Sequence, residues 1–237
     1  MTKLITKLTV PTALIALLLT PVTAMAATTA QSTDPQTRIT AIKTKGDSEI
    51  NRRLTSLSSL QSKINGATKL TANDKAYLSS EVNSEINGLT SLKTKLDGDT
   101  TLADARTDAK TIFTGYRVYA LVVPKVSLIK TADDQQVVED KLTALAQKLQ
   151  TRLDAAKSSG KNTTALQAKL NDMRTQISNA HDISSAIEAK VLVLQPSDYN
   201  SDHALLSGDS AQLKAAHSNN VAARNDAKAI IDGLKSL

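Results

Sequence analysis

The strongest periodic pattern in the chain is LQAKLNDMRTQISNAHDISSAIEAKVLVL, residues 166–194. Its apolar residues recur at spacings of three and four, which is typical of one buried stripe along a long α-helix. The stripe is close to a sustained heptad, the repeat found in coiled coils. Its members are Leu166, Leu170, Met173, Ile177, Ala180, Ile183, Ile187, Val191 and Leu194. This stretch predicts an all-α fold.

The same spacing extends over most of the remaining chain. Glycine and proline punctuate the pattern, and Thr71 with Asp74 has the spacing of a capping box. The predicted elements are a helical hairpin at 36–97, kinked helices at 101–158, and helices at 163–194 and 209–235. Short loops favour antiparallel neighbours. We therefore expect one elongated antiparallel helical bundle of five or six long helices, with coiled-coil-like seams and a kink or short break at Pro124.

The first 26 residues have the order of a secretory signal peptide. Lys3 and Lys7 precede an uncharged apolar run from Leu8 to Leu19, and Ala24-Met25-Ala26 follows as a cleavage site. As a helix this run would span roughly 18 Å, against about 30 Å for a hydrocarbon core. We expect cleavage after residue 26, a disordered leader at 27–35 and a helical-bundle domain at 36–237. An uncleaved N-terminal anchor is the alternative, and no transmembrane helix is expected after cleavage.

Composition excludes several classes of function. The chain has no cysteine, so it has no disulfide, thiolate metal ligand, nucleophilic thiol or lipid-bearing cysteine. It has four tyrosines, one phenylalanine and no tryptophan, too few for the stacking platforms that bind single-stranded nucleic acid. The net charge of +6 is spread along the sequence, as on solvated helix surfaces. An exported chain without cysteine is typical of bacteria.

The densest apolar segment is FTGYRVYALVVP, residues 113–124, which holds three of the five aromatic residues. Because it is apolar nearly all round, one interpretation is a buried helix at the centre of the bundle. The other is a ligand cleft or partner groove opened at the proline. The candidate residues of such a patch are Phe113, Tyr116, Tyr119 and Pro124.

A second candidate site lies in the segment between the last two long helices. In the segment 198–209, Asp198, Asn200 and Asp202 stand at alternate positions and Asp209 is the twelfth residue. The oxygens of these four side chains could surround a calcium ion. Two departures weaken the pattern, because His203 stands where the sharp turn requires glycine and an aspartate replaces the usual glutamate. The alternative is that these residues form turns and cap the last helix. No other cofactor is expected.

Short sequence runs resemble a known group of proteins. TDAKTI (107–112), YRVY (116–119), PK (124–125) and LNDM (170–173) are similar to segments of exported all-helical proteins from candidate phyla radiation bacteria, Saccharibacteria among them. The resemblance implies export and an all-α fold. That group has no assigned activity, so it implies no catalytic or binding residue.

These observations favour a secreted, non-enzymatic helical-bundle protein. Its three histidines are isolated in the sequence, and no spacing brings a nucleophile to a base. We expect it to act by surface contact, as an adhesion, scaffold or partner-binding protein, at or outside the bacterial envelope. Its partner would be a protein or glycan of the cell surface, or a second copy of the chain. The alternative function is a small-ligand or divalent-cation-binding module that uses residues 198–209 or 116–124.

Overall fold

The computed structural model describes residues 34–237, and every regular element in that range is a helix. Five helices are 27 to 36 residues long and a sixth has 13 residues. The predicted all-α bundle is therefore confirmed. The predicted signal peptide, 1–26, and residues 27–33 of the predicted leader lie outside the described residues.

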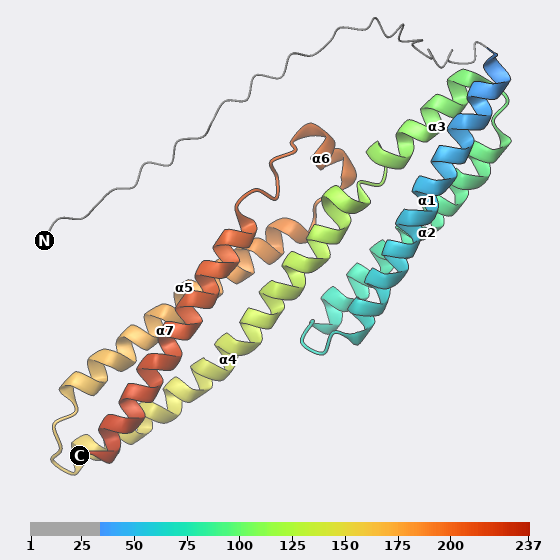
Figure 1. Ribbon diagram of the computed structural model, residues 1–237. Coiled ribbons are helices and arrows are strands. Elements are labelled where there is room, and N and C mark those ends of the chain that lie inside the picture. Colours follow the sequence, from blue (N-terminus) through green and yellow to red (C-terminus); the bar gives the residue numbers. More distant parts are fainter. Residues whose placement is uncertain (1–33) are drawn as a thin grey trace, which may run out of the picture.

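The helices form two groups of three that lie end to end (Figure 1). We call α1, α2 and α3 the N-terminal bundle, and α4, α5 and α7 the C-terminal bundle. A π-helix, η1, joins α3 to α4, so these elements run in one line through both bundles (Figure 1). The bounds are α1 (Pro35–Gly66), α2 (Ala72–Gly98), α3 (Leu102–Thr114), η1 (Val118–Val122), α4 (Val123–Ser158), α5 (Thr164–Leu192), α6 (Pro196–Ser201) and α7 (Asp209–Lys235).

The start of α1 differs from the expected leader boundary. Asp34 accepts a hydrogen bond from the backbone N–H of Thr37 (2.9 Å), and Pro35 occupies the first helical turn. A carboxylate cap followed by proline is a common helix start, because proline has no N–H that would need a partner there. Residue 35, expected in a disordered leader, is therefore the first residue of α1.

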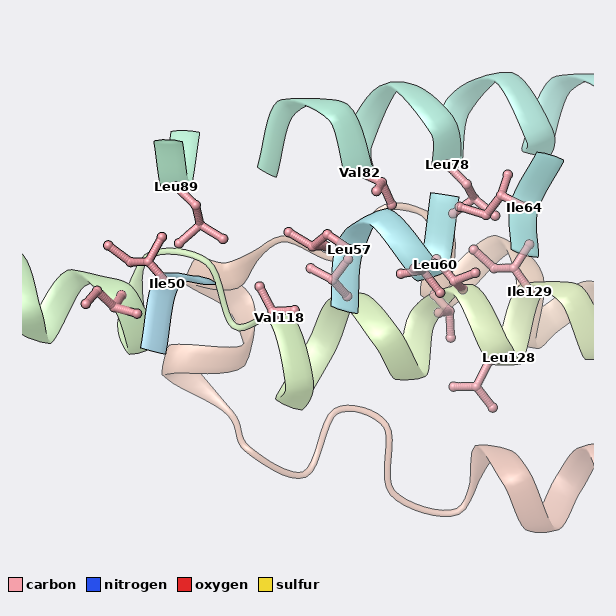
Figure 2. Close-up of a cluster of buried hydrophobic side chains, with 14 of the residues drawn as sticks. Ile50, Leu57, Leu60, Ile64, Leu78, Val82, Leu89, Val118, Leu128 and Ile129 are labelled. Carbon is pink, nitrogen blue, oxygen red and sulfur yellow. The ribbon is translucent and has the colours of Figure 1, made fainter. Parts of the chain in front are cut away.

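The core of the N-terminal bundle is built mainly from leucine, isoleucine and valine, with a few alanines. Side chains from α1, α2 and the first half of α4 meet in it, as the close-up in Figure 2 shows. The core also includes Ile187 and Val191 near the end of α5 and Leu213 near the start of α7. The apolar contacts of the N-terminal bundle thus continue into the helices of the other bundle.

The C-terminal bundle buries a more regular set of side chains. They recur at spacings of three and four, as the sequence predicts, although coiled-coil packing itself stays a prediction. Alanines supply part of the set on α7, which lets that helix approach its neighbours closely. The residues are Leu142, Ala146, Leu149 and Leu153 of α4, Leu170, Met173 and Ile177 of α5, and Ala223, Ala227 and Ile230 of α7.

A polar layer interrupts this regular core. The sequence assigns Ile183 to the buried stripe of α5, but the structure buries Ser184 there and leaves Ile183 half-buried. Ser184 donates to the buried carboxylate of Glu139 on α4 (3.1 Å), and Asn220 on α7 donates to the same group (3.2 Å). Each helix therefore places one polar side chain at the same level of the core.

The interruption of the third helix lies before Pro124. Helix α3 ends at Thr114, Arg117 has a left-handed backbone (φ 44°), and η1 begins at Val118. Pro124 lies in the first turn of α4, immediately after η1, so its missing N–H falls beside the π-turn. The left-handed residue and the π-turn interrupt the helix just before this proline, where the sequence predicts a kink or short break.

A buried ion pair joins the two bundles. Lys125 of α4 is fully buried, and its Nζ lies 2.8 Å from Oε2 of Glu81 on α2. The same Nζ donates to the backbone carbonyl of Leu194, just after α5 (3.0 Å). One ammonium group thus contacts segments from both bundles.

The segment between α5 and α7 is largely exposed. It contains the six-residue helix α6, then Asp202–Gly208 without a helix, and Gly208 adopts a left-handed conformation (φ 85°). Lys190 near the end of α5 pairs with Asp209 at the start of α7 (2.8 Å). The two ends of the segment therefore lie close together.

One stretch, Leu102–Ser158, is long and apolar enough to cross a membrane by length and composition. Of its most apolar window, 44% is buried inside the protein. The core helix of a globular protein passes the same test, so the stretch is weak evidence for a membrane-spanning helix.

Candidate partner-binding surface

The structure separates the four predicted patch residues. Phe113, at the end of α3, is 46% exposed, and Tyr119, in η1, is 41% exposed. Tyr116 is half-buried against α2, where a Cβ at Gly88 would lie 2.7 Å from its ring. Pro124 is half-buried in the first turn of α4. The two outward aromatics form the candidate surface, and Tyr116 packs inward.

Arg53 of α1 joins the two exposed rings. Its guanidinium lies 4.6 Å from the ring centre of Phe113 and 5.2 Å from that of Tyr119, within the range of cation–π contacts. Only 5% of Arg53 is exposed. The neighbouring Arg52 lies 5.3 Å from the Tyr119 ring on the solvent side. We call Arg52, Arg53, Phe113 and Tyr119 the arginine–aromatic surface.

Glu49 on the previous turn of α1 fixes both arginines. Its carboxylate pairs with Arg52 (2.6 Å) and with Arg53, which also donates to the Glu49 carbonyl oxygen (3.0 Å). The hydrogen bond from Arg53 is the main reason that the pKa of Glu49 lies below its usual value, with Arg52 adding to the effect. Because one carboxylate faces two guanidinium groups, the surface keeps a positive excess.

The irregular backbone between α3 and α4 places Tyr119. Three successive N–H groups, those of Ala120, Leu121 and Val122, point to the carbonyl oxygen of Arg117. This π-turn projects Tyr119 toward α1, where its hydroxyl donates to the carbonyl oxygen of Arg52 (3.2 Å). Single π-turns inside helices are frequent at functional sites.

The predicted calcium ligand Asn200 supports this turn from α6. Its Oδ1 accepts a hydrogen bond from Arg117 Nε (2.6 Å), and its Nδ2 donates to the carbonyl oxygen of Thr114 (2.9 Å). The Thr114 carbonyl is at the end of α3, where helix carbonyls lack intrahelical partners. Asn200 therefore stabilises the break between α3 and η1.

The other three predicted calcium ligands have separate roles. Asp198 accepts the Gln195 N–H at the start of α6 (2.8 Å), and Asp202 accepts the Ala204 N–H in a local turn (2.8 Å). Asp209 is buried and pairs with Lys190. The structure engages these side chains in turns, a cap and an ion pair, which matches the alternative interpretation of the segment, and its contacts give the calcium interpretation no support.

Two shallow hollows flank the arginine–aromatic surface. One, of about 410 Å³, lies between α1 and α3 and includes Ile42, Gly46 and Phe113 in its lining. The other, of about 310 Å³, includes Ser56, Leu60 and Tyr119. A hollow of about 460 Å³ lies on the α4–α5 seam beside His181, but no phenylalanine or tyrosine lines it. Aromatic and arginine side chains are enriched where proteins bind partners, so we favour the first face.

A serine, a histidine and a glutamate lie in line near that third hollow. Ser185 Oγ is 3.4 Å from His181 Nε2, and His181 Nδ1 is 3.3 Å from Glu139 Oε2. Acyl-transfer triads have this order, but they also need free N–H donors for the oxyanion. The backbone N–H groups around Ser185 are inside α5 and donate to helix carbonyls. The backbone beside Ser185 therefore offers no oxyanion site.

Sequence reasoning missed the two arginines and Glu49. They lie on α1, about sixty residues before the aromatic segment, and a charged triplet on an amphipathic helix is usually a solvated face. The only available signal was their spacing, because Glu49 and Arg53 are one helical turn apart. Their contact with the aromatic segment depends on how α1 packs against α3.

Comparisons with protein-family models, with curated proteins and with solved structures found no match to this chain. A functional conclusion therefore depends on the surface itself, because an all-α architecture alone does not determine what a protein does. The resemblance to exported bacterial proteins stays a prediction.

Proposed function

We propose that this protein is a secreted, non-enzymatic binding module that acts by surface contact at or outside the bacterial envelope. Its partner-binding face would be the arginine–aromatic surface. The observation that carries the proposal is the placement of the aromatic residues. All five lie within the described range, and none belongs to the buried core.

This placement is unusual because aromatic side chains bury large apolar areas and normally dominate cores. Here the cores consist of aliphatic side chains, while Tyr77, Phe113 and Tyr119 are each at least 40% exposed. Two of these three meet at one place, beside two arginines. An exposed aromatic pair held by buried and paired charges is better explained by binding than by stability.

The chemistry of the face fits a protein or glycan partner of the cell surface. Arg52 offers guanidinium donors to carboxylates or hydroxyls, and the two rings offer apolar faces for stacking. Because Glu49 and Arg53 hold these groups in place, little side-chain entropy would be lost on binding.

A small ligand is the second candidate, and the hollow beside Tyr119 and Val123 favours it. Its volume is at the lower end for ligand pockets, and it is open to solvent. A small ligand in this hollow would contact Tyr119 but not Phe113, whereas a macromolecular partner would contact both rings.

The test is binding of the purified, labelled protein to intact cells of the source organism. Arg52→Ala removes an exposed group and Phe113→Ala removes one ring, and each should reduce cell binding about tenfold or more. Val221→Ala truncates an equally exposed apolar residue on α7 and is the matched control. Circular dichroism would establish that each variant is folded.

Unchanged binding of both folded variants would contradict the proposed face. Loss of binding only in Tyr119→Ala would favour the small-ligand alternative. The same preparation tests secretion, because the exported protein should begin at Ala27 by mass spectrometry.

A further inference from the structure

Three carboxylates from three helices converge at the joint between the bundles. Asp74 lies in the first turn of α2, Asp133 in the first half of α4 and Glu188 in the last turns of α5. One oxygen atom from each lies within 4.8 Å of the other two. Among residues 34–237 this is the only such group of acidic or histidine side chains.

The group is buried and one of its oxygens lacks a partner. Asp133 is 1% exposed and Asp74 is 5% exposed, whereas Glu188 is half-buried. Oδ2 of Asp133 accepts the backbone N–H of Thr71 (2.8 Å), but Oδ1 is buried without a hydrogen-bond donor in the described part of the chain. A buried carboxylate oxygen without a donor carries a large desolvation cost.

Nearby lysines do not neutralise these carboxylates. Lys130 pairs with Asp134 (2.7 Å), and Lys75 donates to the carbonyl oxygens of Asn65 and Ala67. Within residues 34–237, no lysine or arginine forms an ion pair with any member of the group. Three like charges at this separation repel strongly in a site of low dielectric constant.

We propose that Asp74, Asp133 and Glu188 form a binding site for a hard divalent cation, and that calcium is its preferred ion. Carboxylate oxygens are the ligands that calcium prefers, and calcium–oxygen distances of about 2.3–2.6 Å suit oxygens within about 5 Å of one another. Magnesium requires shorter bonds and a nearly ideal octahedron. Water would complete the coordination through the half-buried side of Glu188.

A bound ion would cross-link the two bundles. It would connect the first turn of α2 to α4 and α5, close to the place where Thr71 already donates to Asp133. The site is independent of the arginine–aromatic surface, which contains none of its residues. Its expected effect is on the stability of the joint, so failure of this proposal would leave the proposed function standing.

The competing occupant is a proton. Burial, with the charges of Asp74, Glu188 and Asp134, raises the pKa of Asp133 to about 6, although the Thr71 N–H opposes the shift. At pH 7.5 the carboxylate is mostly charged and available to a cation. Measurements at this pH therefore separate a cation site from a carboxyl group that stays protonated.

The experiment is calorimetric titration of the chelator-treated protein with calcium chloride and, separately, magnesium chloride at pH 7.5. We expect one calcium per chain, with a Kd of about 10⁻⁴–10⁻³ M as in extracellular calcium modules, and weaker magnesium binding. Thermal unfolding followed by circular dichroism should show a rise in Tm of about 5 °C at 5 mM calcium.

Two variants identify the site. Asp133→Asn keeps an acceptor for Thr71 but removes one charge, so it should raise the Tm of the calcium-free protein and abolish the calcium response. Asp74→Asn should also abolish the response. Its matched control is Asp104→Asn, because Thr101 caps α3 by accepting the Asp104 N–H, as Thr71 caps α2 by accepting the Asp74 N–H. The control should respond to calcium as the unaltered protein does.

Absence of calcium binding in the unaltered protein would overturn the proposal. Binding retained in both Asp74→Asn and Asp133→Asn would also overturn it, since the ion would then be at another place. Because Glu188→Gln changes a half-buried side chain and should fold normally, loss of calcium binding in this third variant distinguishes a missing ligand from a misfolded protein.

Discussion

In the C-terminal bundle three long helices lie side by side, whereas in the N-terminal bundle the third helix stops after 13 residues and continues as a π-turn. The regular bundle exposes a helical surface with no aromatic pair. The interrupted bundle exposes Phe113 and Tyr119 beside two arginines. Uniform packing buries most of the apolar stripe, and the exposed aromatic pair lies where the helical period is broken.

The two bundles also differ in the charged groups that they bury. In the C-terminal bundle, Glu139 is buried among neutral donors from α5 and α7, and Asp209 is buried in a pair with Lys190. The joint and the N-terminal bundle bury Lys125, Asp74 and Asp133. One buried ammonium group and two buried carboxylates thus lie where the bundles meet, and three substitutions test how the two bundles differ.

Lys125→Ala should have the largest effect. It leaves Glu81 in a mostly buried site without its cation, which typically costs about 3–5 kcal/mol of unfolding free energy. Because the pair holds α2 against α4 and α5, amide hydrogen exchange should accelerate in α1 and α2 more than in the distal half of α7. Equal acceleration in all helices would mean that the two bundles unfold as one unit. The double variant Lys125→Met with Glu81→Gln should recover most of the loss.

Asn220→Ala tests the polar layer of the regular bundle. It removes a donor from Glu139, which stays buried, so urea unfolding should show a loss of about 1–3 kcal/mol. Replacing the pair together, Glu139→Leu with Asn220→Leu, should reverse the sign, because no buried charge remains and Ser184 keeps its bond to the Ala180 carbonyl oxygen. A double variant that is less stable than Asn220→Ala would show that the layer stabilises the bundle through more than paired hydrogen bonds.

Glu85 makes the N-terminal bundle sensitive to pH. Burial, with the charge of Glu81, raises its pKa to about 7, and Lys125 opposes the shift. In the unfolded chain its pKa is close to the usual 4.5, so between pH 4.5 and 7 the folded protein binds more protons and loses stability as pH rises. We expect a decrease of about 1–2 kcal/mol, after allowance for solvent screening.

Glu85→Gln should remove most of this decrease when urea unfolding is measured from pH 4.5 to 7.5. The remainder should come from Asp133, whose pKa is also raised and which acts in the same direction. A pH profile unchanged by the substitution would show that another group is responsible.

The regular helices could be predicted from the sequence because the apolar period, the capping residues and the glycines indicate the same helix boundaries there. The helix expected at 209–235 is α7, Asp209–Lys235, and its buried stripe includes Leu213, Ala223 and Ile230. Such agreement between local signals is what makes a segment fold in one way. The all-α class followed from the same agreement.

The exceptions have physical causes that no local pattern contains. Ser184 occupies a core position because its hydroxyl donates to Glu139, which also accepts from Asn220, and both partners are far away in sequence. The apolar period alone favoured Ile183 at this level. The acidic group at the joint joins residues from three helices, up to 114 positions apart. The segment 198–209 had oxygen ligands at suitable spacing, but α6 turns Asn200 toward Arg117.

The exposed stretch Asp202–Gly208 makes α7 separable in principle from the rest of the fold. Exposed loops with small and polar residues are preferred sites of proteolysis and of tolerated insertion. A chain cut there would still hold α7 through Leu213, Ala216 and Ile230, which are buried against its neighbours, and through the pair of Asp209 with Lys190. The protein could therefore be divided into two fragments that reassemble without a covalent link. The new chain ends would lie beside α6, the helix whose Asn200 stabilises the break between α3 and η1.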